Sequence, residues 1–403
     1  MSKVIVIGGG PAGLMSAYAA SLRGHQVKLF EKNAQFGKKL QLTGHGRCNV
    51  TNNCSKEEFF QHICHNEKFL YSSFSRFSNQ DLLRFFKEHG LITVEEDKGR
   101  MFPSSQSAMD VVLFFLDRLK ENKVEFHTNE ACTSLIVENN QIIGIETEKQ
   151  SYSADFVIVS TGGLSFQQTG STGDGLQWAK ELGLKVTNTY PGLVSIHSPI
   201  QNLAGLSLKN IGLYISSNQK KLYHSNGDLL FTHQGISGPA ILIASNYIIN
   251  KNPTTIHLDF VPKQSLEQLD QRLLKAMQKA PNKTCQNVFE QLLPKRLVQE
   301  ILNRIEMPLN QKVNQTNKAQ RLSFVEKLKD FDLEITGFGT YNEAMVTIGG
   351  ISTKEINPKT MESKTIKSLK FAGEILDLDG ETGGYNLQIA WSTGYSAGST
   401  INL

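Results

Sequence analysis

The first thirty residues show a hydrophobic pattern that changes from strand to helix and back to strand. Lys3 to Ile7 is a β-branched run, Pro11 to Leu22 carries apolar residues at helical spacing, and Gln26 to Phe30 alternates between polar and apolar positions. Together these segments predict one βαβ unit, with a glycine-rich turn between its first strand and its helix.

Strand and helix patterns remain mixed in the following stretch of the chain, up to Gly163. Asp155 to Ser160 reads as a buried strand that ends in a glycine turn, and Gly173 to Gly175 opens a helix that continues to about Leu182. A second junction of strand, turn and helix is therefore expected. Further helical periodicity covers 81–89 and 107–122, and strand-like pieces lie near 124–128, 133–137 and 142–148.

From about Pro191 the pattern changes to short strands and then to a long helical tract. Ile211 to Ile215 and Thr255 to Phe260 read as strands, whereas 266–328 is helical with interruptions at three prolines. This change of character predicts an inserted domain that is first β-rich and then helical.

The end of the chain returns to the first pattern, with a buried strand over 368–372 and a helix over 386–399. We therefore expect an α/β fold in which an insert domain interrupts a Rossmann-like FAD/NAD(P)-binding domain, a mixed sheet with flanking helices. The predicted boundaries are 1–190 and 339–403 for the binding domain and 191–338 for the insert.

Composition narrows the class of protein without changing this architecture. A length of 403 residues fits two domains, and 39% hydrophobic and 20% charged residues are typical of a globular enzyme. The net charge of +4 is spread over 42 basic and 38 acidic side chains, with no run of like charges. On this basis we expect no nucleic-acid partner.

The cysteines and the apolar stretches indicate the compartment. Cysteines at positions 48, 54, 64, 132 and 285 form no CxxC pair and no metal-like spacing, which favours a reducing compartment and no metal site. No apolar stretch approaches the roughly 18 residues of a membrane helix, and the segment before the first glycine turn is too short for a signal peptide. We expect a cytoplasmic protein that acts on a small molecule, without a membrane partner. The oligomeric state stays open.

A dinucleotide-binding fingerprint lies between the first strand and the first helix. Gly8, Gly10 and Gly13 form a GxGxxG motif in this context, with Pro11 and Ala12 inside it. The first glycine permits a tight turn, the second lets the backbone approach a pyrophosphate, and the third allows close helix packing. The N-terminus of the helix then presents N–H groups to the phosphates.

An acidic residue ends the second strand, where such a motif needs one. Glu31, followed by Lys32, lies 18 residues after Gly13. A carboxylate here can accept hydrogen bonds from both ribose hydroxyls and would repel a 2′-phosphate, so we expect FAD or NAD and not NADP. The fingerprint alone does not separate FAD from NAD.

A second glycine-rich segment, 37–52, carries a family resemblance that favours FAD. Its block GHGRCNVTN over 44–52 resembles the signature of the aminoacetone oxidase family of bacterial FAD-binding enzymes, also described as NAD(P)/FAD-dependent oxidoreductases with an insert domain. Further segments that resemble this family occur in the family's order at 230–240, 349–351, 360–363, 371–377 and 383–388. The resemblance therefore covers nearly the whole chain.

The resemblance implies where FAD would be bound. Gly373-Glu374 is similar to the Gly-Asp pair that many flavoproteins place against the ribityl chain, and the N-terminus of the last helix would face the flavin pyrimidine edge. The glycine turn of 161–163 is a further candidate loop. Beyond the first fingerprint, the candidate cofactor residues are Lys39, Thr43, Gly44, Gly46, Arg47, Cys48, Asn49, Thr161, Gly162, Gly163, Gly373, Glu374, Gly384, Tyr385 and Asn386.

Groups for acid–base catalysis are indicated less strongly. His45, His233 and Tyr385 are the polar side chains nearest the family motifs, although a lone histidine is more often structural. Cys48 has no neighbouring cysteine at CxxC spacing, so packing against the cofactor is the favoured interpretation for this thiol.

We predict an FAD-dependent oxidoreductase whose small organic substrate docks between the binding domain and the insert. Only one GxGxxG is present, so we expect no dedicated NAD(P)H domain, and the first hypothesis is an amine or aminoacetone-type oxidase whose flavin is reoxidised by dioxygen. One alternative is a reductase of activated C=C bonds in steroid-like compounds, with NAD(P)H as a transient electron donor. A flavin-binding sensor without enzymatic activity is the other.

Overall fold

The computed structural model describes residues 1–218 and 220–402, and the chain divides into two compact units. The first unit comprises Met1–Gly192 and Thr340–Leu403, and the second comprises Leu193–Gly339. The hydrophobic pattern places the two boundaries after residues 190 and 338. Each unit has its own hydrophobic core.

The first unit is built on a five-stranded sheet with the order β21-β11-β1-β2-β7. β1 lies in the middle and pairs in parallel with β2 and β11, and four of its five residues are buried. All four pairings in this sheet are parallel, whereas the sequence led us to expect a mixed sheet. Parallel strands are covered on both faces, which explains their continuous apolar runs. The strands are β1 (Lys3–Ile7), β2 (Gln26–Glu31), β7 (Glu125–Thr128), β11 (Phe156–Val159) and β21 (Leu369–Phe371).

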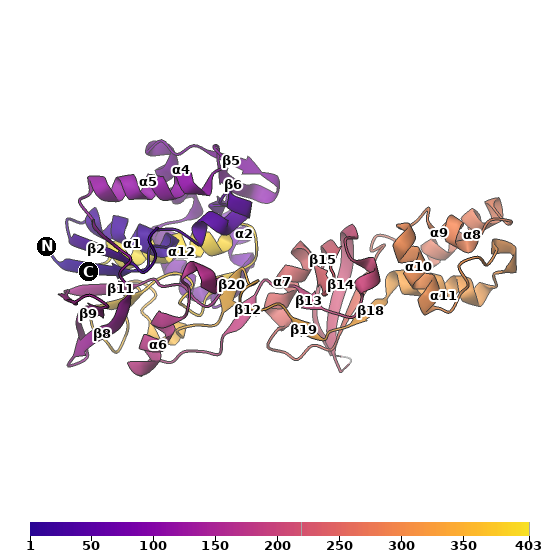
Figure 1. The fold of residues 1–403 in the computed structure, drawn as a ribbon. Coiled ribbons are helices and arrows are strands. Elements are labelled where there is room, and N and C mark those ends of the chain that lie inside the picture. The colour runs from indigo at the N-terminus through magenta and orange to yellow at the C-terminus, as the bar shows by residue number, and fades with distance from the viewer. Residues whose placement is uncertain (219, 403) are drawn as a thin grey trace. The chain divides into compact units, whose positions relative to one another are not determined.

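The first and last helices of the chain pack against each other in this unit (Figure 1). α1 covers Pro11–Ser21 and α12 covers Tyr385–Ser399. A Cβ on Gly394 of α12 would lie 2.4 Å from the carbonyl oxygen of Ala12, so the glycine is what permits this close contact. The C-terminal segment therefore returns to the first strand–helix junction.

Smaller elements complete the first unit. α4 begins with a capping box in which Ser78 and Asp81 satisfy each other's backbone N–H groups. The remaining helices are α2 (Lys56–Gln61), α3 (Glu67–Arg76), α4 (Asn79–Glu88), α5 (Ala108–Glu121) and α6 (Asp174–Glu181). The small sheets combine β3 (Thr51–Asn52), β6 (Arg100–Pro103) and β5 (Thr93–Glu96); β10 (Ser151–Ser153), β9 (Gln141–Thr147) and β8 (Cys132–Glu138); β12 (Tyr190–Gly192) and β20 (Val346–Ile348); and β22 (Asp379–Gly380) and β4 (Ile63–His65).

The second unit is a seven-stranded sheet with the order β18-β17-β14-β15-β16-β13-β19, in which each neighbouring pair is antiparallel. Its longest strands, β14 and β15, form a hairpin against which the apolar helix α7 packs. The elements are β13 (Ile196–His197), β14 (Ser207–Ser217), β15 (Lys220–Phe231), β16 (Gly235–Ser237), α7 (Pro239–Ile248), β17 (Thr255–Asp259), β18 (Phe331–Glu334) and β19 (Gly337–Phe338).

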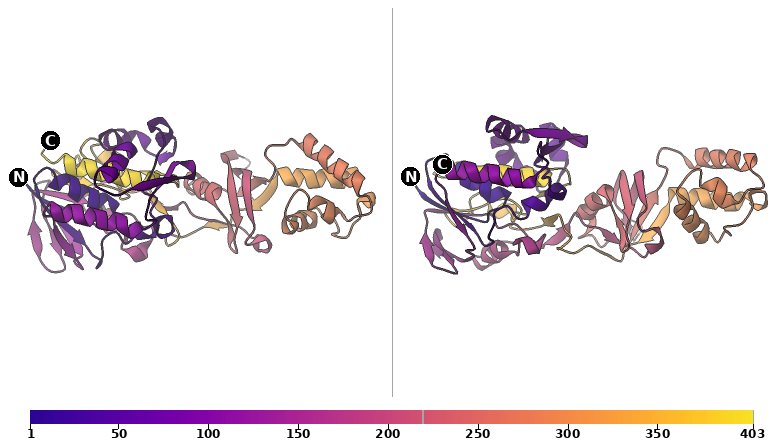
Figure 2. Two further views of the ribbon diagram at one scale, coloured as in Figure 1. Left: turned by 90° about the horizontal axis from the view of Figure 1, so that it is seen from above. Right: turned by 45° about the horizontal axis from the view of Figure 1, so that its top comes forward.

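The helical tract of this unit is an insertion between two neighbouring strands of the sheet. Helices α8 (Leu266–Lys279), α9 (Cys285–Phe289), α10 (Lys295–Arg304) and α11 (Lys318–Lys329) lie between β17 and β18, which are direct neighbours. The four helices group together in both views of Figure 2. Each predicted proline interruption lies between two helices. Within the described part of the chain, no helix is both long and apolar enough to cross a bilayer.

Candidate functional site

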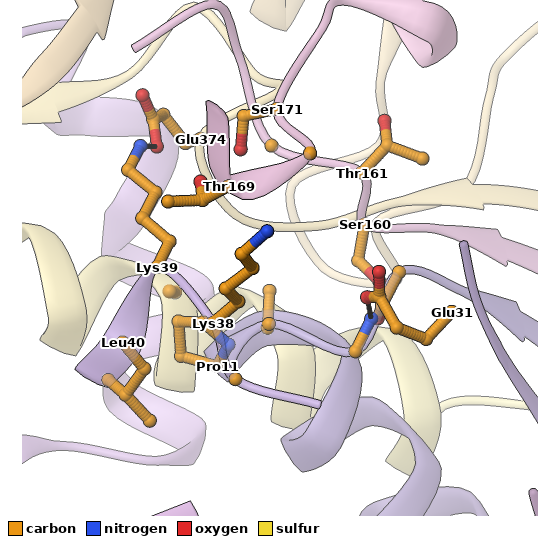
Figure 3. A pocket seen from close by; sticks show the side chains of 18 of the residues that line it. Pro11, Glu31, Lys38, Lys39, Leu40, Ser160, Thr161, Thr169, Ser171 and Glu374 are labelled. Carbon is orange, nitrogen blue, oxygen red and sulfur yellow. Dashed lines mark hydrogen bonds and ion pairs between the residues drawn. The ribbon is translucent and has the colours of Figure 1, made fainter. Parts of the chain in front are cut away.

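A cleft in the first unit opens at the carboxyl ends of the parallel strands. It is lined by the ends of β1, β2 and β11, by the turn before α1 and by the first turns of α12 (Figure 3). Its empty space, counted together with the open solvent at its mouth, is about 1280 Å³. Ligands of open α/β sheets bind at this edge, so the cleft is the candidate functional site.

The cleft brings together part of the predicted set. The predicted residues that line it are Gly8, Gly10, Pro11, Ala12, Glu31, Lys32, Lys39, Thr43, Thr161, Gly162, Glu374 and Asn386. The predicted residues outside its lining are Gly13, Gly44, His45, Gly46, Arg47, Cys48, Asn49, Gly163, Gly373, Gly384 and Tyr385. His233 belongs to the second unit, where it is exposed.

In the turn after β1, each of the three motif glycines has a different structural role. Gly8 has a φ of +101°, which favours glycine. A Cβ on Gly13 would lie 1.8 Å from the carbonyl oxygen of Gly8, so close packing of α1 on the turn requires this glycine. A Cβ on Gly10 would meet no atom of the described chain within 4 Å, and Gly10 lines the cleft. The packing of the protein leaves the space next to Gly10 open for a ligand.

The N-terminus of α1 is a prepared anion site. Gly10 is its N-cap and Pro11 occupies the first turn, and no side chain caps the helix or places a negative charge there. The N–H groups of the first turn are therefore available to a ligand, and the helix dipole favours negative charge at this end. A pyrophosphate has the charge and the acceptor oxygens that this position binds.

Glu31 is held at the end of β2, beside the glycine turn. One carboxylate oxygen accepts a hydrogen bond from the backbone N–H of Gly9 at 2.8 Å, and the other accepts from the backbone and the side chain of Asn33 at 2.9 and 2.7 Å. These contacts fix the direction of the carboxylate. Because a carboxylate has about four acceptor positions and three are used, about one is left for a ribose hydroxyl.

A buried and unsatisfied hydroxyl lies near the same end of the cleft. Thr161 follows β11 and lines the cleft, and its Oγ1 makes no hydrogen bond within the described chain. The atom would lie 2.5 Å from a Cβ on Gly175, so it faces α6. Gly10, the α1 N-terminus and Glu31 together fit the adenosine and pyrophosphate part of FAD.

Glu130 fixes the loop that closes this end of the cleft. Its buried carboxylate accepts hydrogen bonds from Thr147 and Tyr152 at 2.9 Å each and lies 3.2 Å from both His127 and Lys149. Burial by itself would raise the pKa of Glu130, but these donors outweigh it and lower the pKa to about 2. This residue could not be predicted from the sequence, because a single glutamate on a loop matches no motif.

Replacement of Glu130 by Gln should destabilise the first unit. We expect a loss of about 1–3 kcal/mol in the free energy of unfolding at neutral pH, since the donors around the side chain lose a charged acceptor. The stabilisation by Glu130 is complete above the ordinary glutamate pKa, which is about 4.3, and is lost as the pH falls toward 2. Urea unfolding of wild type and Glu130→Gln should therefore differ at pH 7 and converge in acid. The exposed Glu148→Gln serves as the control, and equal stability of Glu130→Gln and wild type at pH 7 would contradict the assignment.

A second charged cluster lies across the cleft, where β21 ends. Glu374 forms an ion pair with Lys39 and accepts hydrogen bonds from the Ser165 hydroxyl and from the backbone N–H of Thr347 (Figure 3). Burial favours a raised pKa for Glu374, but the Lys39 ammonium and the two hydrogen bonds hold the pKa below its usual value. The carboxylate is therefore ionised and joins four separate segments of the chain.

The GHGRCN block shapes the backbone near the cleft instead of lining it. His45 and Cys48 adopt left-handed conformations with φ of 58° and 61°, and His45 is exposed. Arg47 pairs with Glu96 at 2.7 Å and lies over the ring of Phe102. Burial raises the pKa of the Cys48 thiol to about 12, so this thiol is not a nucleophile. Strained backbone of this kind is typical of functional loops.

The N-terminus of α12 meets the cleft through Asn386 and Leu387, while Tyr385 points into the core. Tyr385 is buried and stacks on His62 with ring centroids 4.5 Å apart. The side chain of Asn386 bonds both backbone groups of Gly380 at 2.9 and 2.8 Å. Gly384 caps the helix with a φ of +99° and no capping side chain, so this second set of helix N–H groups is also available.

Several lining residues were not predicted. Lys38 is exposed and its side chain extends into the cleft beside Pro11 (Figure 3). It adjoins the predicted Lys39, so its position in the second segment could have indicated it. Of the others, five lie inside motif segments, namely Gly9, Gly37, Leu40, Ala372 and Leu387. The rest lie outside them: Ile7, Phe30, Asn33, Glu130, Cys132, Ser160, Thr169, Gly170, Ser171, Asp174, Trp178, Met345, Val346, Leu378, Ile389 and Ala390.

A parallel sheet with a glycine turn, an anion-binding helix end and an acidic strand end defines a protein of the Rossmann-type dinucleotide-binding class. The family model described as "HI0933-like protein Rossmann domain" matches residues 2–400. The chain belongs to this family and is an FAD-dependent oxidoreductase.

The chain is similar over its full length to characterised relatives. It is 30% identical to the ribosomal RNA dihydrouridine synthase of Escherichia coli, covering 98% of this chain and 97% of that protein. It is 29% identical to the 3-dehydro-bile acid delta(4,6)-reductase of Clostridium scindens, covering 99% and 98%. A solved 3-ketosteroid-delta4-(5alpha)-dehydrogenase from Rhodococcus jostii RHA1 shares the fold, with 12% identity, a TM-score of 0.53 and coverage of 98% and 96%.

Proposed function

We propose that this protein reduces carbon–carbon double bonds that are conjugated to a carbonyl group. The observation that carries the proposal is the full-length similarity to two relatives whose names describe such reductions. Dihydrouridine is uridine with its ring double bond reduced, and a delta(4,6) bond system in a 3-dehydro bile acid is conjugated to the 3-oxo group. The two candidate substrates for this chain are accordingly a uracil ring in RNA and a steroid-like enone.

FAD supplies hydride chemistry when it is bound. The α1 N-terminus and Glu31 would hold its phosphates and ribose, and the ion pair of Lys39 with Glu374 would lie on the opposite side of the cleft. Leu40, Val346, Leu378 and Leu387 add apolar side chains to the lining of the cleft, which limits access of water.

An amine or aminoacetone-type oxidase is the second candidate. It is supported by the resemblance of the 44–52 block and by the single GxGxxG motif, which leaves dioxygen as a simple electron acceptor. The two candidates differ in electron donor: NAD(P)H for the reductase and the amine itself for the oxidase.

Anaerobic spectroscopy of the holoprotein tests this choice. We expect NADH or NADPH to bleach the flavin absorbance, and we expect either 4-androstene-3,17-dione or deproteinised ribosomal RNA to restore it in the absence of air. The saturated analogue 5α-androstane-3,17-dione is the control and should leave the spectrum bleached. Bleaching by aminoacetone but not by NAD(P)H, followed by formation of hydrogen peroxide in air, would establish the oxidase instead.

A further inference from the structure

The positive charge of the chain is concentrated in the helices of the second unit. The first unit has 25 Lys and Arg against 27 Asp and Glu, whereas Leu266–Lys329 has twelve against six. The strands and loops of the second unit have five of each. The expectation that nucleic acid is not a partner used the charge of the whole chain, which conceals this difference.

Most of these basic side chains are unpaired with acids. Four of the twelve form ion pairs, namely Arg304, Arg321, Lys327 and Lys329. The other eight are exposed and lie in no ion pair within the described chain: Arg272, Lys275, Lys279, Lys283, Lys295, Arg296, Lys312 and Lys318.

Five of the eight lie along α8 and on the two segments that pair after it. Arg272, Lys275 and Lys279 are three and four residues apart, so they share one face of the helix. Lys283 follows that helix, and its carbonyl accepts a hydrogen bond from the N–H of Val313 at 3.0 Å, which brings Lys312 alongside. We call Arg272, Lys275, Lys279, Lys283 and Lys312 the α8 basic surface.

The side chains of the α8 basic surface can bind phosphates but offer no ring on which bases could stack. The aromatic residues of Leu266–Lys329 are Phe289 and Phe324, and both are fully buried. Stacking on exposed aromatic rings is what holds unpaired bases, so contacts here would be to the sugar–phosphate backbone.

We propose that the α8 basic surface binds the phosphate backbone of RNA, and that RNA is the substrate class of the reductase. The second statement rests on the proposed function. Of the two candidate substrates, RNA is a polyanion, and an array of cations without acidic partners is complementary to it and has no use in binding a steroid-like enone. The contacts are independent of base sequence and dock the RNA without selecting the uridine.

A triple variant tests the surface. Lys275→Gln, Lys279→Gln and Lys283→Gln are made together in the full-length holoprotein, because exposed glutamines keep the helix and remove three charges. Filter binding of deproteinised ribosomal RNA should show a dissociation constant at least about tenfold higher than that of wild type at moderate salt. The slope of log affinity against log salt should fall by about 2–3, since each phosphate contact contributes about 0.9.

A matched variant, Lys56→Gln with Lys68→Gln and Lys87→Gln, removes three exposed helical lysines of the first unit. It should bind RNA as wild type does, and both variants should keep the flavin spectrum and the unfolding temperature. The inference is overturned if wild type does not bind the RNA, if the α8 variant binds equally well, or if both variants weaken equally. Reduction of 4-androstene-3,17-dione without RNA binding would remove this inference alone. RNA binding without reduction of either substrate would remove the proposed function, and with it the statement on substrate class, but would leave the assignment of the α8 basic surface as an RNA-binding surface.

Discussion

Gly10→Val should give a folded protein that no longer holds FAD. The backbone at this position is extended, with φ −80° and ψ −176°, a conformation that valine adopts readily. A Cβ here would meet no atom of the described chain within 4 Å, so the fold should tolerate a small side chain. The same side chain would fill the space that a pyrophosphate needs in order to reach the N–H groups of α1. We expect the dissociation constant for FAD to rise at least about a hundredfold, which corresponds to about 2.7 kcal/mol.

Gly13→Val is the control for Gly10→Val. It changes another glycine of the same motif, one that is needed for helix packing. Its Cβ would lie 1.8 Å from a backbone oxygen, so this variant should be unstable with or without flavin. The measurements are far-UV circular dichroism and FAD titration of the apoprotein. A Gly10→Val protein that is yellow as isolated, with wild-type FAD affinity, would show that the cleft beside Gly10 is not the cofactor site.

The central sheet could be predicted from the sequence because its inner strands are apolar along their whole length. β1 and β11 are buried on both faces, so they appear as continuous apolar runs that end in glycine turns. β18 and β19 could not be predicted, since strands of four and two residues give no usable periodicity and depend on pairing with neighbours distant in sequence. The direction of strand pairing is likewise a tertiary property, which is why the sheet was expected to be mixed.

In the site, the residues that the sequence indicated are those that belong to a recognisable motif. Gly8, Gly10 and Glu31 belong to a motif with fixed spacing, so position in the chain is enough to assign them. The side chain of Tyr385 lies in the core although its neighbour Asn386 lines the cleft, because successive residues of a helix point about 100° apart. Glu130 acts through four partners from other parts of the chain, which no local pattern records.

Glu374→Gln should weaken the protein by breaking its ion pair with Lys39, which joins two segments that line the cleft. Removing one partner of a largely buried pair leaves the other charge without compensation, which costs about 3–5 kcal/mol in a full interior. Lys39 and Glu374 keep about a fifth of their side-chain surface exposed, at 21% and 19%, so we expect the lower value of about 2–3 kcal/mol. The double variant Lys39→Met with Glu374→Gln should lose less than the sum of the two single variants.

The pH dependence of the stability follows from the lowered pKa of Glu374. The stabilisation by Glu374 is complete above the ordinary glutamate pKa near 4.3 and disappears as the pH falls through the lower pKa of the folded state, so wild type and Glu374→Gln should converge in acid.

Urea unfolding with and without FAD distinguishes two roles of this carboxylate, which are to join segments of the chain and to contact the cofactor. If Glu374 also contacts the cofactor, the substitution weakens FAD binding and costs more stability in the holoprotein than in the apoprotein, because a ligand stabilises only the folded state. Equal losses in both forms would restrict Glu374 to joining the segments of the chain, and additive losses in the double variant would contradict the ion pair itself.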